Sequence, residues 1–312
     1  PSHDSRHHGP SVVSNGSMER TVNRLLLAVL LTSCTHSESI AAEPTPYAVA
    51  TPQSKIRRAS DPDEGLAIGT FQALTAGIEI GIFTSDAPHI LGDGRVRVVR
   101  VDPAVADVVV HSIVGTAIRP QGADSWAATR GLTVAFNPAM YHPDGKSVFY
   151  LKTPERESQP VWKASSSSAL VIDPKGVKLL DVTCDGRARL NTATTIVQSW
   201  RLLDCARKPT WKEKPKIWSH ALLGADSQGR LLFIHARTPW STRAFTEIVL
   251  ALPLDVQRLH YAEGGPEASL VVVHDGVERV WVGSYETGFT EHDNNRLAWN
   301  LPHILGVVAR QP

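Results

Sequence analysis

A glycine-rich turn between two apolar runs constrains the fold of this chain more than any other feature of its sequence. The run Leu259–Ala262 leads into the turn, and the run Leu270–Val273 follows it. Apolar runs of this length, bounded by glycine and proline, are typical of buried strands. Two carboxylates, two glycines and a proline lie between them: Glu263, Gly264, Gly265, Pro266 and Glu267.

The composition of this turn favours a functional interpretation without requiring one. Glycine can adopt a positive φ, and because it lacks a Cβ atom another backbone or a ligand can approach it closely. The two glutamates are expected where two strands end, which is a common place for chemistry on a rigid scaffold. An ordinary glycine turn with solvated glutamates fits the same pattern, because turn residues alone specify no function.

Apolar periodicity predicts a mixed fold for the rest of the chain. Arg95–Val101 alternates valine with arginine, which predicts a strand with valines inward and arginines outward. In Thr242–Leu252 the apolar residues recur at helical spacing, between the strands expected at Leu231–His235 and from Leu259 onward. If those strands are parallel, the glycine turn lies at the carboxyl end of the sheet, where ligand crevices form. We therefore expect an α/β fold of the mixed α+β kind, with one domain of mixed β-sheets flanked by a few helices over residues 65–312.

A second candidate segment follows the strand predicted at Leu132–Phe136, which delivers Asn137 to its end. Pro138 cannot continue a central ladder, so the chain must turn there, and Tyr141 and His142 follow shortly. An amide and an imidazole at a strand end can hold sugar hydroxyls or phosphate oxygens. The same residues also fit an Asn-Pro turn with a surface histidine.

Two further features leave alternatives open. Cys184 and Cys205 can pair outside the cytoplasm, but a simple hairpin about Asp185-Gly186 would carry them apart, so a disulfide requires the chain to fold back. Trp200 and Arg201 end another apolar run and face either the site or the core. A further strand is expected at 148–151.

The N-terminal region predicts export. Residues 1–17 are polar and patternless, which indicates a non-native or upstream extension, with Met18 as the natural start. After Met18, two arginines precede the run Leu25–Leu31, which is too short to span a bilayer and matches a signal segment over residues 18–41. Residues 42–64 are rich in proline and cations and lack an apolar period, so we expect a flexible linker.

Two processing sites fit this signal segment. Leu31-Thr32-Ser33-Cys34 resembles a bacterial lipobox, in which Cys34 becomes the lipidated N-terminus; a competing cleavage follows Ser39-Ile40-Ala41. The chain is therefore expected to be periplasmic or a membrane-anchored lipoprotein, touching the membrane only through its lipid anchor.

Charge and motifs exclude several other functions. A net charge of +1 is too balanced to suggest a nucleic-acid partner. The sequence contains no dinucleotide-binding or P-loop motif, so no cofactor is predicted. The thirteen histidines do not form a metal-ligand spacing, so no metal site is assigned, and the need for a divalent metal stays open. His220, His235 and His260 lie in apolar strands, where core histidines are more common than ligands, although they could still face one pocket.

Several short segments occur in an order and spacing that match a known pattern. They are Gly131–Asn137, Ser219–Gly224 with Gln228–Arg230, Ile234–Arg237 with the following helix, and Glu263-Gly264-Gly265 with Ser269. Over roughly residues 75–310 these segments resemble the phosphodiester glycosidase family, many of whose bacterial members are exported. The family usually has aspartate where Glu263 stands, a third glycine after Gly265, and Arg-Thr in place of Ser219-His220.

The resemblance implies a hydrolase that cleaves a glycosyl phosphodiester between the sugar C1 and the phosphate oxygen. Such a reaction needs a carboxyl group to move a proton or stabilise an oxocarbenium-like centre, and donors for the phosphate oxygens. We predict a catalytic group of Glu263, Asn137 and His220. A second set is predicted to bind the substrate and its phosphate: Arg237, Gly264, Gly265, Ser269, Glu267, Tyr141 and His142. The alternative is a non-catalytic envelope lipoprotein that binds glycans in the same crevice.

Overall fold

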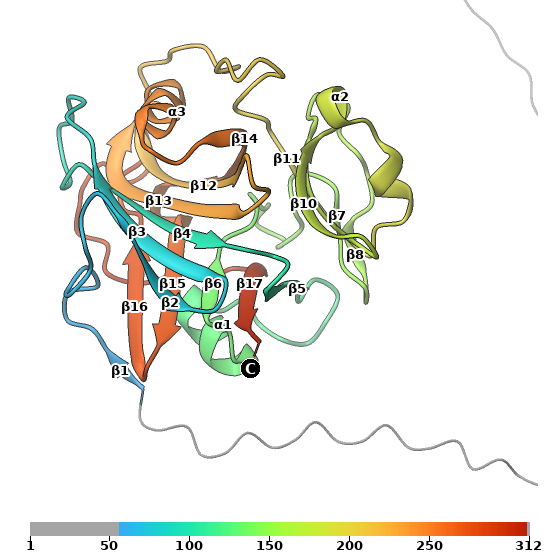
Figure 1. Cartoon of the computed structure of the whole chain (residues 1–312), viewed down its shortest axis with the longest axis horizontal. Helices are drawn as coiled ribbons and strands as arrows, with labels where there is room; N and C mark the ends of the chain where they lie inside the picture. Colours follow the sequence, from blue (N-terminus) through green and yellow to red (C-terminus); the bar gives the residue numbers. More distant parts are fainter. Residues whose placement is uncertain (1–55, 311–312) are drawn as a thin grey trace, which may run out of the picture. The chain divides into compact units, whose positions relative to one another are not determined.

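Two six-stranded sheets face each other across the main apolar core of the described residues, 56–310, in this computed structural model (Figure 1). The expected extension, the signal segment with Cys34 and the linker up to residue 55 lie outside these residues. The first sheet has, in neighbour order, β14 (Val256–Gly264), β12 (Trp218–Asp226), β13 (Leu231–Trp240), β4 (Arg95–Val101), β3 (Ile78–Thr84) and β2 (Phe71–Thr75). The second has β1 (Arg57–Arg58), β16 (Val277–Val282), β15 (Ser269–His274), β6 (Val134–Phe136), β17 (His303–Ala309) and β5 (Ala106–Ser112).

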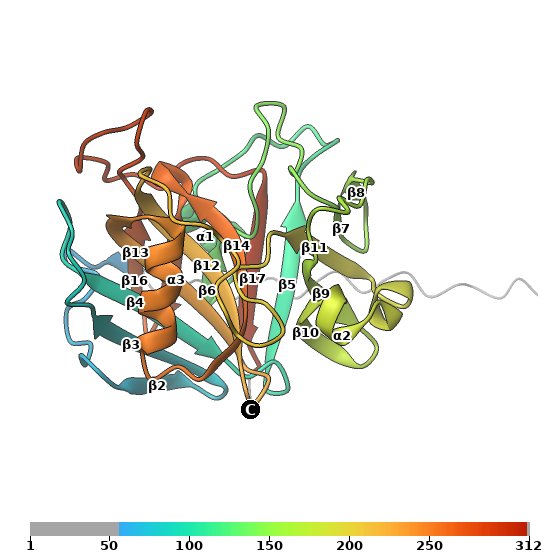
Figure 2. The same ribbon diagram turned by 90° about the horizontal axis from the view of Figure 1, so that it is seen from above.

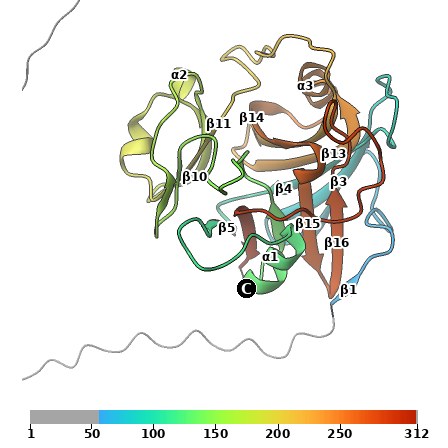
Figure 3. The same ribbon diagram turned by 180° about the vertical axis from the view of Figure 1, so that it is seen from behind.

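The outer faces of these sheets are covered by the two longer helices, α3 (Thr242–Ala251) and α1 (Ala123–Arg130) (Figures 1 and 3). Phe245 of α3 packs with the apolar residues on the outer face of the first sheet. Trp126 of α1 packs on the outer face of the second sheet. The prediction of mixed β-sheets flanked by a few helices is confirmed. Among the described helices, none combines the length and the apolar character that crossing a bilayer requires.

The glycine turn lies at the carboxyl end of β14, as the strand–helix–strand pattern predicts. β12 pairs antiparallel with both β13 and β14, so β13 and β14 run in the same direction with β12 between them. The Ser241 hydroxyl accepts a hydrogen bond from the Ala244 N–H and caps α3, which connects the two parallel strands. The chain then leaves β14 through the turn and enters β15 of the second sheet, so the turn joins the two sheets.

Strand β4 corrects the expectation that its arginines point outward. Val96 and Val98 pack on the α3 side, whereas Val99 and Val101 pack between the sheets. Because both faces of the strand are covered, Arg97 is buried as well, and its guanidinium pairs with Asp63 and Asp93.

Residues 56–64 belong to the expected linker, yet they pack on the fold. Arg57 and Arg58 form β1 and pair with β16. Asp63 is buried and accepts hydrogen bonds from Arg97 Nε at 3.1 Å and Trp281 Nε1 at 2.7 Å. Burial raises the pKa of Asp63, but hydrogen bonds and charge from Arg97 outweigh it and lower the pKa to about 2. Asp63 therefore neutralises the charge of the buried Arg97.

A third sheet lies to one side of the first two (Figure 2). In neighbour order it contains β10 (Gly176–Asp181), β9 (Ser168–Asp173), β11 (Thr195–Ser199), β7 (Leu151–Lys152) and β8 (Glu157–Gln159). The strand expected at 148–151 is mostly wrong, because β7 begins only at Leu151. The Val148 N–H donates to the Met140 carbonyl, and the Tyr150 N–H donates to the Gln198 side chain, so neither N–H joins a ladder.

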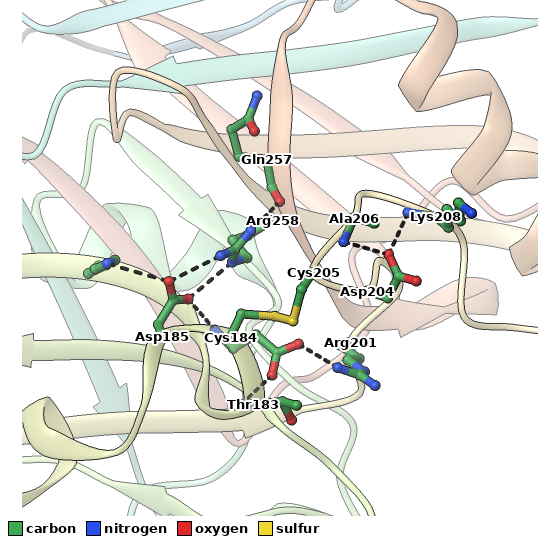
Figure 4. The surroundings of a disulfide bond; sticks show 12 residues. Thr183, Cys184, Asp185, Arg201, Asp204, Cys205, Ala206, Lys208, Gln257 and Arg258 are labelled. Carbon is green, nitrogen blue, oxygen red and sulfur yellow. Dashed lines mark hydrogen bonds and ion pairs between the residues drawn. A yellow bond between two sulfur atoms is a disulfide. The ribbon is translucent and has the colours of Figure 1, made fainter.

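Cys184 and Cys205 form a disulfide, with Cα atoms 5.5 Å apart (Figure 4). After the short helix α2 (Val182–Asp185) the chain folds back through the 3₁₀ turn η1 (Ala188–Asn191) and β11. This return brings Cys205 beside α2, where Arg258 also donates to the Asp185 carboxylate. The disulfide thus ties the third sheet to the segment between Trp200 and Trp211.

Replacing both cysteines by serine is expected to lower the free energy of unfolding by about 2–3 kcal/mol, because the bridge restricts the unfolded chain. Urea denaturation of the parent and the double variant under oxidising conditions measures this difference. Reduction of the parent should reproduce the stability of the variant and should leave the variant itself unchanged. An unaltered midpoint after reduction would contradict the prediction.

Candidate active site

A cavity of about 560 Å³ opens where β14 ends in the glycine turn. Its lining combines three half-buried carboxylates, Glu263, Glu267 and Glu286, with a single lysine, Lys214. The remaining wall is largely aromatic or apolar: Tyr141, Trp200, Trp211, Trp218, Tyr261, Phe289, Met140 and Val148, with Gly264 at the base. Cavities lined by apolar rings with a few convergent polar groups are the usual form of small-ligand sites.

The geometry of the turn explains why positions 264 and 265 are both glycine. Gly264 continues the strand with φ −134°, and an added Cβ would collide with the Tyr261 hydroxyl and the Trp218 ring. Gly265 begins the 3₁₀ turn η2 (Gly265–Glu267) with φ +65°, and the Glu286 carboxylate packs where its side chain would be. Only the second glycine has the positive φ that both were free to adopt. The close approach brings Glu286 onto the turn that carries the other two acids.

The pKa values of the three carboxyl groups are all raised. Burial, reinforced by the charge of Glu267, raises the pKa of Glu263 well above its ordinary value, although the Gly264 N–H and the Asn137 side chain oppose this. Burial, with the charge of Glu286, raises the pKa of Glu267 to about 7. Burial also raises the pKa of Glu286, and nearby Lys216 opposes that rise. Unequal raised pKa values among neighbouring carboxyls are a common feature of acid–base sites.

Asn137 meets the same turn from the second sheet. It follows β6, its side chain is buried, and its Nδ2 donates to the Glu267 carbonyl at 3.1 Å. Its amide oxygen accepts a hydrogen bond from the Ala139 N–H, which sets the orientation of the amide group. Asn137 therefore positions both the turn and the Glu263 carboxyl without lining the cavity itself.

The aromatic wall is built from the segment after β11 and from β14. The Trp211 and Tyr261 rings stack with centroids 5.4 Å apart and an angle of 19° between their planes. Trp200 meets Trp211 edge-on at 5.2 Å. Trp200 thus faces the site, whereas Arg201 pairs with Asp181 away from it. Flat ring faces of this kind offer apolar surface to a sugar or to a cationic group.

Besides Asn137 and Gly265, four further predicted site residues do not line this cavity. The His220 ring is buried, lies within 3.0 Å of the Trp240 carbonyl through Nε2 and stacks on Phe245, and burial lowers its pKa to about 3. Ser269 is buried in β15, and His142 lies in an exposed turn. His220 in β12 and Ser269 in β15 are therefore buried packing residues beside the turn.

Arg237, the fourth of these, lies in a second cavity of about 470 Å³. Its guanidinium pairs with Asp293 at 2.6 Å and donates to backbone carbonyls of Val282 and Asn295. Through these bonds the Arg237 side chain holds the loop that follows β16. His235 lines the same second cavity, so the buried strand histidines do not converge on the site.

Sequence reasoning missed several lining residues. The tryptophans at 211 and 218 follow Trp200 in one short segment, and this local density was an available signal. Glu286 and Phe289 carry no such signal, because they reach the cavity through a loop joining β16 to β17. Within residues 56–310, no group of three or more histidine, cysteine or acidic side chains is arranged to hold a metal ion.

Of the comparisons with known proteins, the one with solved structures agrees with this fold. No protein-family model matches the sequence, and no curated protein matches it. The structure is similar to the catalytic domain of zebrafish N-acetylglucosamine-1-phosphodiester α-N-acetylglucosaminidase, solved in a form auto-inhibited by its pro-peptide. The TM-score is 0.54 at 16% identity, covering 77% of this chain and 86% of that one. A hypothetical protein from Synechocystis gives a TM-score of 0.47 at 11% identity, covering 76% of this chain and 63% of that one. The first likeness shows a distant structural relationship to a glycosidase catalytic domain.

Proposed function

We propose that this chain is a hydrolase that cleaves glycosyl phosphodiesters, breaking the bond between the sugar C1 and a phosphate oxygen. The observation that carries the proposal is the convergence of Glu263, Glu267 and Glu286 in one aromatic-lined cavity. Glycoside cleavage uses carboxyl groups of unequal pKa in such a setting. The shared fold with a phosphodiester glycosidase supports the choice of a phosphate leaving group.

In the proposed reaction, water attacks C1 and gives its proton to the Glu267 carboxylate. The bond from C1 to the phosphate oxygen breaks, and that oxygen takes the proton of the Glu263 carboxyl group. Glu286 stabilises the positive charge that develops at C1 and the ring oxygen. Lys214 pairs with the phosphate, and Asn137 orients Glu263.

The rival is a non-catalytic protein that binds envelope glycans in the same cavity, and the aromatic wall supports it. A panel of p-nitrophenyl glycosides, UDP-sugars and alkyl glycosyl phosphodiesters, incubated with the protein, separates the two. Release of free sugar and a phosphomonoester from the diesters is expected. Binding of the sugars without release from any substrate would favour the glycan-binding alternative.

The rate of hydrolysis is expected to fall about tenfold for each unit of pH below 7, because Glu267 must be ionised to accept a proton and burial raises its pKa to about 7. The rate should fall again at higher pH, where Glu263, whose pKa burial raises well above its ordinary value, loses the proton that it donates. A profile of kcat/KM against pH measures both limbs.

The raised pKa of Glu267 also predicts how the stability of the fold changes with pH. The folded pKa of Glu267 lies above its ordinary value, so its contribution to stability is present below about pH 4.5 and is lost as the pH rises through 7. Glu267→Gln should therefore remove the acid limb of activity while raising the melting temperature at pH 8. A variant that keeps the limb, or is less stable at pH 8, would contradict the assignment.

The proposal includes export of the chain, which the signal-like pattern of residues 18–41 supports. Mass spectrometry of the native N-terminus is expected to find an acylated Cys34. An unmodified chain beginning at Ala42 would reject the lipid and retain the secretion.

A further inference from the structure

The carboxyl groups of the cavity differ from the other buried acids of the described chain in having no counter-ion. All four aspartates that are buried within residues 56–310 pair with an arginine: Asp63, Asp173, Asp181 and Asp226. Glu263, Glu267 and Glu286 form no ion pair with any described residue. A buried carboxylate without a partner is costly, so those acids that are ionised give the cavity a negative potential, which its single lysine, Lys214, does not balance through an ion pair.

The rings around these acids add potential of the same sign. The face of an aromatic ring carries partial negative charge and attracts a cation, most strongly when the ring is tryptophan. Three tryptophans line the cavity, at positions 200, 211 and 218, together with Tyr141, Tyr261 and Phe289. The Trp211–Tyr261 stack and the edge-on Trp200 hold these rings in place. Rings combined with unpaired carboxylates suit an ammonium group better than a neutral sugar alone.

We propose that the group this cavity recognises beside the sugar is an ammonium ion, so that the substrate is a glycosyl phosphodiester of an amino alcohol. This inference rests on the proposed function. The charges then match throughout: the ammonium group lies among the rings and carboxylates, and the phosphate pairs with Lys214. A simple anionic diester lacks a partner for the acids.

Choline and its neutral isostere 3,3-dimethylbutan-1-ol test this directly, because the two differ in charge and hardly in shape. Titration of the full chain with each, followed by tryptophan fluorescence and calorimetry, should show choline binding at least about tenfold more tightly. Ethanolamine against propan-1-ol provides the same comparison for a primary ammonium group. Equal affinities within both pairs would overturn the proposal.

Variants assign the preference to this cavity. Glu286→Gln and Trp211→Leu should each reduce the preference for choline severalfold, whereas Glu213→Gln removes one exposed carboxylate outside the cavity and should leave it unchanged. A preference that survives both cavity variants would overturn the assignment. Circular dichroism checks that each variant is folded, and Glu286→Gln keeps the size of the side chain.

Hydrolysis separates this inference from the proposed function. Glycosyl phosphocholine should be cleaved with a higher kcat/KM than glycosyl 3,3-dimethylbutyl phosphate. Equal cleavage of both would overturn the ammonium inference and leave the hydrolase intact. Tighter binding of choline with no cleavage of either diester would support the ammonium site and reject the hydrolase.

Discussion

Replacing Glu263 by glutamine is expected to lower the rate of hydrolysis by about 10²–10⁴-fold, because the amide cannot give up the proton that the leaving oxygen takes. The fold should be retained. Burial raises the pKa of Glu263 well above its ordinary value and so favours the uncharged carboxyl group, which glutamine replaces by an uncharged group of the same shape. Turnover of a cleaved diester and the melting temperature at the same pH measure the two effects.

Glu247→Gln is the matched control, since Glu247 lies exposed on α3 and, among the described residues, pairs only with Arg243. That variant should keep full activity. Near-normal turnover of Glu263→Gln would remove Glu263 from the mechanism, and the Glu267 carboxyl group would then be the next to test as the proton donor.

Gly283→Ala is expected to cost about 4 kcal/mol of stability and to abolish activity. A Cβ at this position would overlap the Gly265 carbonyl oxygen and press on the side chains of Ser219 and Ala268. None of these atoms is the free end of a flexible side chain, so the turn itself must move. Gly283 also donates its N–H to the Ala268 carbonyl, and that hydrogen bond would be lost.

Urea denaturation and turnover of a cleaved diester measure these losses. Gly229→Ala is the control, because an added Cβ there meets nothing within 4 Å and only the φ of +78° is unfavourable, at about 1 kcal/mol. If Gly283→Ala proves no worse than this control, the packing of the loop against the turn is not what holds the site.

The parts of the site that could be predicted from sequence are those determined by neighbours along the chain. The apolar run, the two glycines and Glu263 form one strand and its turn, and the helical spacing in 242–252 identifies α3. Asn137 was predictable because Pro138 ends its strand. Each of these features depends on residues a few positions away.

The rest depends on contacts between distant segments. Arg237 lies within β13, but its guanidinium pairs with Asp293, 56 residues further along the chain. Glu286 reaches the turn only because Gly265 leaves room for it. The disulfide required knowledge of how the chain returns through β11. No local pattern encodes any of these three contacts.

The turn that joins the two main sheets carries the two carboxyl groups that move protons, whereas most of the rings that contact the substrate lie on other segments. Two carboxyl groups, Glu263 and Glu267, sit on a rigid crossover that both sheets and Asn137 support. The recognising rings come mostly from elsewhere, from residues 200–218 and from the loop after β16. Loops tolerate sequence change far better than the elements that carry them. Descendants of this chain could therefore change the molecule they accept by altering the rings of these two segments, while inheriting Glu263, Glu267 and Asn137 unaltered.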